Sequence, residues 1–156
     1  MTFPELASDG IGVYGNSLGG SVALHAAAAL PELNAVVVDS TFASVRWIVD
    51  HQLQALLKVP DWFGGVLLAV GSLEAGINVD DASPMAAAQQ LGDRPLLIIH
   101  GSADQTFQVA NAQLIHAAAS GPRDLWILDG VGHSEAYSRN PTEYVARVDA
   151  LFTSAR

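Results

Sequence analysis

The sequence predicts a single α/β domain over residues 1–156, with a mostly parallel sheet of about four strands, flanking helices and a helical insertion. Two observations lead to this prediction. Short apolar runs of strand length recur along the chain, and segments with helical spacing of apolar residues lie between them. Strands that alternate with helices are typical of parallel sheets with right-handed crossovers. Because half of the residues are hydrophobic and no linker or repeat divides the chain, we expect one core.

Four segments have the character of strands. Residues 10–15 (GIGVYG) form an apolar run bounded by glycines, and Ala-rich sequence follows at residues 21–30, which predicts a buried strand that turns sharply into a helix. Residues 34–38 are β-branched on both faces, as in a strand buried on both sides of a parallel sheet. The same pattern returns at residues 95–100 and 125–128.

Two further helices follow the third and fourth strands. The first extends over residues 109–118 and stops before Gly121-Pro122. The second carries an apolar stripe between Tyr144 and Phe152. Asn140 can cap its start, Pro141 suits the first helical position, and Glu143 completes the spacing of a capping box.

The segment between the second and third strands, approximately residues 41–94, is too long for a single crossover. Helical spacing recurs within it over residues 45–57 and 62–70, and Ser83-Pro84 opens a third helix. One interpretation is a cap over a functional site. The other is that one helix covers the sheet and the rest are surface elaboration.

The overall charge disfavours several classes of partner and cofactor. With 16 acidic against 7 basic side chains, a net charge of −9 would repel nucleic acid and anionic membrane surfaces. No apolar stretch approaches the roughly 20 residues of a membrane span. The first ten residues contain neither a basic segment nor an apolar run, so we expect a cytoplasmic protein. No metal-ligand spacing or Gly-rich phosphate loop occurs, so no cofactor is expected.

The strongest chemical signal is the turn between the first strand and its helix. Its Gly15-Asn16-Ser17-Leu18-Gly19 segment is a Gly-x-Ser-x-Gly motif in the strand-turn-helix context that a nucleophile elbow requires. Small residues at Gly15 and Gly19 would let the chain turn tightly around Ser17, and the N–H of Leu18 would face a developing oxyanion. The alternative is a glycine-rich turn with an incidental serine.

A serine nucleophile needs a base, and the base needs an orienting group. Asp104 follows the third strand and His133 follows the fourth, so both lie on loops at the same sheet edge as Ser17. The chain order Ser, Asp, His is the order found in hydrolases. We therefore predict that these three residues act together.

Other candidates are less well placed. Asp39 ends the second strand and could also reach the imidazole, although we expect it to cap the following helix together with Ser40. The remaining histidines lie along helices or at a strand end and are expected to be structural: His25, His51, His100 and His116.

On the basis of these residues, the chain resembles the C-terminal half of an α/β-hydrolase, from the nucleophile elbow onward. It is most similar to the bacterial esterase-like branch of that superfamily. The resemblance implies that Ser17 is the nucleophile, Asp104 the acid and His133 the base, that Leu18 provides one oxyanion N–H, and that residues 41–94 form a variable cap. It covers nearly all of the chain and is carried by four segments: Ile11 to Gly20, Asp39 to Ser44, Arg94 to Phe107, and Trp126 to Tyr137.

The chain differs from this superfamily in the part that precedes the nucleophile. Similar proteins carry several strands before the nucleophile and a loop that gives the second oxyanion N–H, so the strand that ends at Ser17 would be an open edge. We expect either a homodimer or a complementing chain at that edge. The leading hypothesis is a serine esterase acting on small carboxylic esters, with amide hydrolysis less favoured. The alternative is a catalytically impaired truncated hydrolase fold that serves as a binding or assembly module, or that needs a partner chain for activity.

Overall fold

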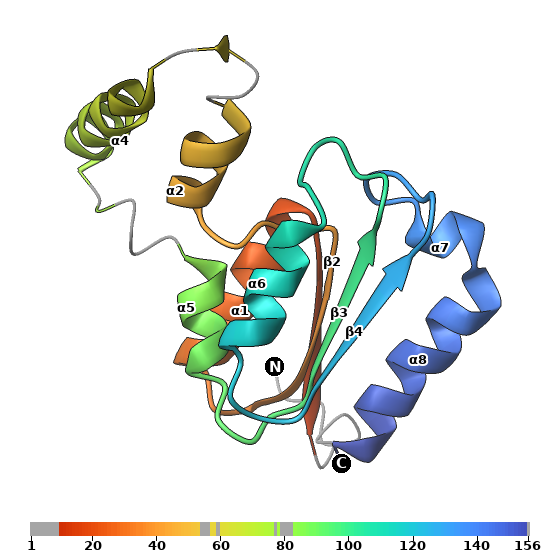
Figure 1. The fold of residues 1–156 in the computed structure, drawn as a ribbon. Coiled ribbons are helices and arrows are strands. Elements are labelled where there is room, and N and C mark those ends of the chain that lie inside the picture. The colour runs from red at the N-terminus through yellow and green to blue at the C-terminus, as the bar shows by residue number, and fades with distance from the viewer. Residues whose placement is uncertain (1–9, 54–56, 59, 77, 79–82, 156) are drawn as a thin grey trace.

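A four-stranded parallel sheet lies at the centre of the fold (Figure 1). A computed structural model of the chain describes residues 10–53, 57–58, 60–76, 78 and 83–155. Neighbouring strands in the sheet follow the order of the chain, and every pair is parallel. The predicted fold class is therefore confirmed, and the strands are β1 (Ile11–Asn16), β2 (Leu33–Asp39), β3 (Leu96–Gly101) and β4 (Arg123–Leu128).

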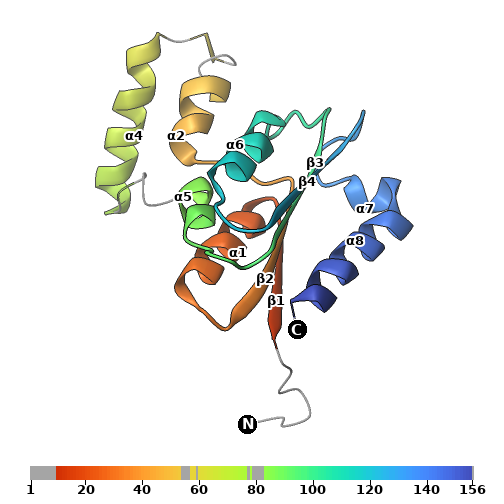
Figure 2. The ribbon, with the colours of Figure 1, turned by 60° about the horizontal axis from the view of Figure 1, so that its bottom comes forward.

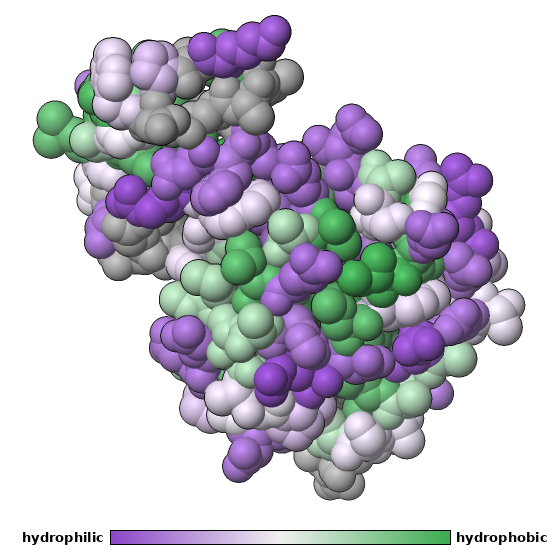
Figure 3. All heavy atoms as spheres, in the orientation of Figure 1, coloured by the Kyte–Doolittle hydropathy of each residue, from purple (hydrophilic) through white to green (hydrophobic). Residues whose placement is uncertain are grey.

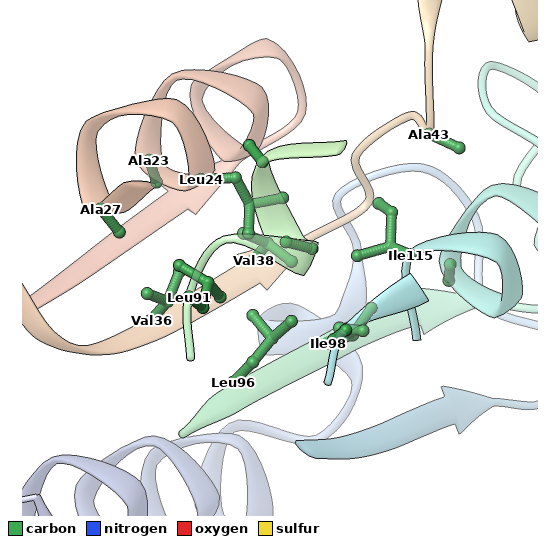
Figure 4. Close-up of a cluster of buried hydrophobic side chains, with 14 residues drawn as sticks. Ala23, Leu24, Ala27, Val36, Val38, Ala43, Leu91, Leu96, Ile98 and Ile115 are labelled. Atoms are coloured by element: carbon green, nitrogen blue, oxygen red, sulfur yellow. The ribbon is translucent and has the colours of Figure 1, made fainter. Parts of the chain in front are cut away.

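The two central strands carry the core because their side chains alternate between two covered faces. Val36 and Val38 of β2 pack with Leu24 and Ile115 on one face, where α1 (Leu18–Ala29), α5 (Pro84–Gln89) and α6 (Ala110–Ala118) lie (Figure 4). Val37 points to the other face, which α7 (Ala136–Arg139) and α8 (Pro141–Ser154) cover (Figure 2). Both faces are apolar, which explains the β-branched runs in the sequence.

The insertion between β2 and α5 forms a separate group of helices. It contains α2 (Val45–Trp47), the π-helix η2 (Ile48–Leu53) and α4 (Asp61–Ala75), with α4 packed on η2 and set apart from the sheet (Figures 1 and 3). The helix predicted over residues 45–57 thus turns into a π-helix, and residues 54–56 lie outside the described part. Apolar side chains of α4 such as Leu73, which is 83% exposed, reach the surface. None of the described helices combines the length and the apolar character that a membrane crossing requires.

The start of α8 differs from the predicted capping box. Asn140 occupies the N-cap position and Pro141 begins the helix, but the Asn140 side chain makes no capping hydrogen bond. The Asn140 N–H does not bond to Glu143, because it donates to the carbonyl oxygen of Ala136, the first residue of α7. Glu143 instead accepts hydrogen bonds from Arg147 within α8.

The packing of α8 against β1 depends on a glycine. A Cβ atom added at Gly12 would lie 2.3 Å from the ring of Phe152 in α8. Real Cβ atoms do not approach other atoms so closely, so only glycine lets the aromatic ring pack this close to the strand.

We expect Gly12→Ala to lower the free energy of unfolding by roughly 1–3 kcal/mol, since the added methyl group forces the Phe152 ring to move in a packed layer. Gly65→Ala is the matched control, because a Cβ at Gly65 would meet nothing within 4 Å and alanine favours a helix interior. Urea denaturation of both variants measures the difference. A Gly12→Ala protein as stable as Gly65→Ala would contradict this account of the packing.

Candidate active site

Ser17 stands at the sharp turn between β1 and α1. Its backbone has φ 53° and ψ −124°, a conformation that is rare for a residue with a side chain. The Ser17 N–H donates to the carbonyl oxygen of Asp39 at the end of β2, with an N···O distance of 2.8 Å. The strand end beside it therefore holds the serine in this strained turn.

Of the two glycines in the motif, only Gly15 is required by close packing of the backbone. A Cβ at Gly15 would lie 2.1 Å from the carbonyl oxygen of Gly19, so the turn admits no side chain there. At Gly19 itself a Cβ would meet nothing within 4 Å, which corrects the expectation that this position must be small. The second steric requirement falls on Gly20, where a Cβ would lie 2.7 Å from the Cβ of Thr41.

His133 reaches Ser17 from the loop that follows β4. Its Nε2 atom lies 2.9 Å from Ser17 Oγ, across 116 residues of sequence. The ring of Phe107 packs edge-on against the imidazole at a centroid distance of 5.4 Å. The side chain of His133 is 25% exposed, so one part of the imidazole remains open to solvent.

Asp104, on the loop after β3, lies on the other side of the imidazole. Its Oδ2 atom is 2.7 Å from His133 Nδ1. The other oxygen, Oδ1, accepts hydrogen bonds from the backbone N–H groups of Thr106 and Phe107, at 2.8 and 2.9 Å. Because the buried carboxyl group is held at both oxygens, it can accept from Nδ1–H and leave Nε2 free to accept from the Ser17 hydroxyl.

Asp39, the rival carboxyl group, is bound elsewhere. Ser40 Oγ donates to its Oδ1 at 2.8 Å, and the hydroxyl of Tyr144 in α8 donates to its Oδ2 at 3.0 Å. Burial raises the pKa of Asp39, and burial together with the negative charge of Asp39 raises the pKa of Tyr144. The expected capping role for Asp39 and Ser40 is wrong, because α2 begins later and Ser44 caps it.

Three of the other histidines make local contacts with backbone or ring partners. His25 Nδ1 lies 2.8 Å from the Ser21 carbonyl oxygen of its own helix, and His51 stacks on Trp47. The Nε2–H of buried His100 donates to the Phe107 carbonyl oxygen at 2.7 Å and lies 3.4 Å from Asp104 Oδ2. His100 therefore helps to hold the loop that carries Asp104.

Sequence reasoning missed the polar residues that link these loops. Ser134 Oγ donates to Asn16 Oδ1 at 2.9 Å, and the Ser134 N–H donates to Ser40 Oγ at 3.0 Å. Serine and asparagine in strand-end loops usually serve their own turns. No local signal indicated that residues from three separate loops would bond to one another.

No candidate metal site occurs in the described ranges, since no group of three or more His, Cys, Asp or Glu residues lies close enough to hold an ion.

No family model matches the chain. Among curated proteins, the uncharacterized protein YqkD of Bacillus subtilis (strain 168) is 27% identical over 140 residues, which are 86% of this chain and 45% of that protein. The chain thus spans less than half the length of this relative.

Solved structures are similar over a larger share of the chain. The esterase Pf2001 of Pyrococcus furiosus matches with a TM-score of 0.69 and 24% identity over 99% of this chain and 56% of that one. The esterase domain of a Rhodothermus marinus protein matches with a TM-score of 0.62 and 22% identity, covering 88% of this chain and 57% of that one. An α/β hydrolase from a lagoon-sediment metagenome, MGS-MChE2, matches with a TM-score of 0.61 and 21% identity over 94% and 62% of the two chains. The chain therefore has an α/β-hydrolase fold that spans only part of the length of these proteins.

Proposed function

We propose that this chain, whose fold is that of the α/β hydrolases, is a serine hydrolase that cleaves small carboxylic esters through an acyl-enzyme. The observation that carries the proposal is one continuous line of hydrogen bonds. It extends from Ser17 Oγ to His133 Nε2 at 2.9 Å and from His133 Nδ1 to Asp104 Oδ2 at 2.7 Å. A hydroxyl, an imidazole and a carboxylate in this order can generate and stabilise an oxygen nucleophile at neutral pH.

The proposed reaction has two halves. In the first, Ser17 Oγ attacks the ester carbonyl while His133 Nε2 takes the hydroxyl proton and then gives it to the departing alcohol. In the second, water attacks the acyl-serine, again giving its proton to His133, and the acid leaves as Ser17 regains its proton. Asp104 keeps the Nδ1 proton directed toward itself and stabilises the imidazolium that forms in each half.

The oxyanion would be bound at the start of α1. Leu18 is the first residue of that helix and directly follows Ser17, so its N–H lies at the positive end of the helix dipole. In α/β hydrolases a second donor comes from a loop that precedes the nucleophile in the chain. We propose that this donor comes from outside residues 10–155.

The surroundings of the site favour an apolar acyl or aryl group in the substrate. Phe107 packs on His133 and on Phe42, so aromatic rings cover one side of the imidazole. The esterases Pf2001 and the Rhodothermus marinus domain have the same fold. These observations support an acyl or aryl ester, with amide hydrolysis as the less favoured activity of the same site.

The insertion is proposed to act as a cap over this site. Gln52 of η2 donates to the carbonyl oxygen of Thr106, two residues after Asp104, at 2.9 Å, and accepts from Asn111 of α6 at 3.2 Å. The insertion is thereby joined to the loop that carries the acid. Its apolar helix α4 would then contribute to the choice of substrate.

We expect wild-type protein to hydrolyse p-nitrophenyl butyrate and Ser17→Ala to lose at least about 10³-fold in kcat, since no other group in the proposed mechanism can form the acyl intermediate. Ser138→Ala is the control, because this exposed hydroxyl donates only to Glu135 in its own turn. Equal turnover by wild type and Ser17→Ala would instead support the alternative of a catalytically inactive binding module.

Asp104→Asn should lower kcat by about 10⁴-fold with the fold intact, because an amide in place of the carboxylate favours the wrong imidazole tautomer. Asp39→Asn should have a far smaller effect, because its side chain can still accept from Ser40. Steady-state kinetics of both variants, with circular dichroism as the check on folding, make the comparison. A larger loss in Asp39→Asn would assign the acid role to the other carboxyl group.

The edge strand β1 is proposed to be a contact between two copies of the chain. In the described part of the protein, β1 pairs only with β2, and its Ile11 and Tyr14 are 54% and 48% exposed. Residues 10–31 contain no Asp, Glu, Lys or Arg in a chain of net charge −9. Free edges are normally protected by charges or proline. Two acidic chains would repel each other least through this uncharged strand and helix, and two β1 strands could pair antiparallel about a two-fold axis.

Size-exclusion chromatography with light scattering should therefore give a dimer at micromolar concentration. Ile11→Lys should shift it to monomer, because a charge on the edge strand opposes strand pairing. Leu73→Lys, at the 83% exposed position in α4, should leave the dimer unchanged. A folded wild-type monomer would contradict the proposed pairing of two copies. A complementing chain would then remain as the proposed partner of this edge.

A further inference from the structure

Three serines with left-handed backbones surround the proposed site. Ser17 follows β1 with φ 53°, Ser40 follows β2 with φ 52°, and Ser134 follows His133 with φ 58°. Residues other than glycine persist in this region only where the surrounding contacts hold them. The reaction uses the side chain of Ser17 alone, so the other two need a different explanation.

The hydroxyl of Ser40 connects a buried carboxyl group to the histidine loop. It donates to Asp39 Oδ1 at 2.8 Å and accepts from the N–H of Ser134 at 3.0 Å. Since the proton of this hydroxyl is directed to Asp39, a lone pair faces Ser134, the residue directly after His133. Ser40 is 1% exposed, so it acts through the protein and does not contact substrate.

The same loop is tied to the nucleophile turn by a second route. Ser134 Oγ donates to Asn16 Oδ1 at 2.9 Å, and Asn16 directly precedes Ser17. The Ser17 N–H donates to the Asp39 carbonyl oxygen at 2.8 Å, which closes a ring of contacts through Ser40. None of these bonds uses the side chains of Ser17, His133 or Asp104, so the ring can set their backbones without taking part in proton transfer.

Asp39 is a firm anchor for this ring because its other oxygen is bound to the opposite helix layer. Tyr144 of α8 donates to Asp39 Oδ2, and the hydroxyls of Tyr14 and Tyr144 lie 3.0 Å apart. The Tyr14 hydroxyl can thus donate to that of Tyr144. Contacts from β1, β2 and α8 thus hold the carboxyl group in place. Ser40, which is bonded to this carboxyl group, in turn holds the loop of His133.

We propose that Ser40 is a positioning residue that holds His133 at the distance from Ser17 needed for proton transfer. This inference rests on the proposed function, because it assigns a role within the same site. Proton transfer requires the imidazole within hydrogen-bond reach of both the serine and the leaving group. A displacement of about 1 Å at such a site can cost about 10²-fold in rate.

The test compares Ser40→Gly and Ser40→Ala with Ser120→Ala. Glycine removes the hydroxyl and readily adopts a φ of 52°, whereas alanine removes the hydroxyl and keeps the strain, so a loss shared by both belongs to the hydroxyl. Ser120 is the matched control, because its hydroxyl also joins two separate segments, donating to the Gln89 carbonyl oxygen at 3.3 Å. Ser120 lies shortly before the start of β4, at the opposite end of the sheet from the loops that carry Ser17, Asp104 and His133.

We expect both Ser40 variants to lower kcat by about 10–100-fold with KM within about twofold of wild type, and Ser120→Ala to match wild type. If Ser40 had a purely structural role, its replacement would lower thermal stability without lowering kcat at an unchanged KM. Wild-type kcat in a folded Ser40→Gly protein would overturn the proposal.

A second measurement does not require turnover. The Cε1–H signal of His133 in ¹H–¹³C spectra, assigned by its absence in His133→Gln, should move in Ser40→Gly and stay in place in Ser120→Ala. An unmoved signal would overturn the positioning role even if the chain is an active hydrolase. A moved signal in a protein without esterase activity would uphold the contact and refute the proposed function, so the two failures are distinguishable.

Discussion

The parallel direction of β1, β2, β3 and β4 is the constraint on which the site depends. Because all four strands run the same way, their carboxyl ends meet at one edge of the sheet, where ligands of such sheets bind. Ser17, Asp104 and His133 each follow a different strand, and only this alignment brings Ser17 within 2.9 Å of a histidine 116 residues away. The end of β2 joins the same edge and supplies Asp39 and Ser40 as support for the loops on either side.

Local strain and polar support occur together at this edge. Ser17, Ser40 and Ser134 all have positive φ, a conformation that costs of order 1–3 kcal/mol for each residue. Hydrogen bonds among the same loops hold these conformations, and the buried Asp39 accepts from Ser40 and from Tyr144 of α8. The strained turn of Ser17 is therefore stabilised by contacts with β2 and with the loop after β4. The positions of Ser17 and His133 depend on the same set of hydrogen bonds.

The sequence contained enough information to predict the sheet, because each strand is a short β-branched or apolar run and each crossover has helical spacing. It also pointed to Ser17, Asp104 and His133, because residues that follow parallel strands lie at the same edge of the sheet. It could not show that Asp39 turns toward Tyr144, since that depends on how α8 packs. The contacts of Ser40 and Ser134 were equally hidden, because each needs two loops placed to within a fraction of an ångström. The predicted capping box also overlooked α7, a four-residue helix too short to show a period, whose Ala136 carbonyl oxygen accepts the Asn140 N–H.

The central claim is that Ser17 is a nucleophile activated by His133 and Asp104. Labelling of the folded protein with a fluorophosphonate, followed by peptide mapping, tests it most directly, because the reagent forms a stable adduct only with an activated serine and needs no knowledge of the substrate. The account predicts a single adduct on Ser17, formed at least about 10³-fold more slowly in His133→Gln. Folded protein that carries no adduct at Ser17, or that is labelled at the same rate without His133, would contradict it.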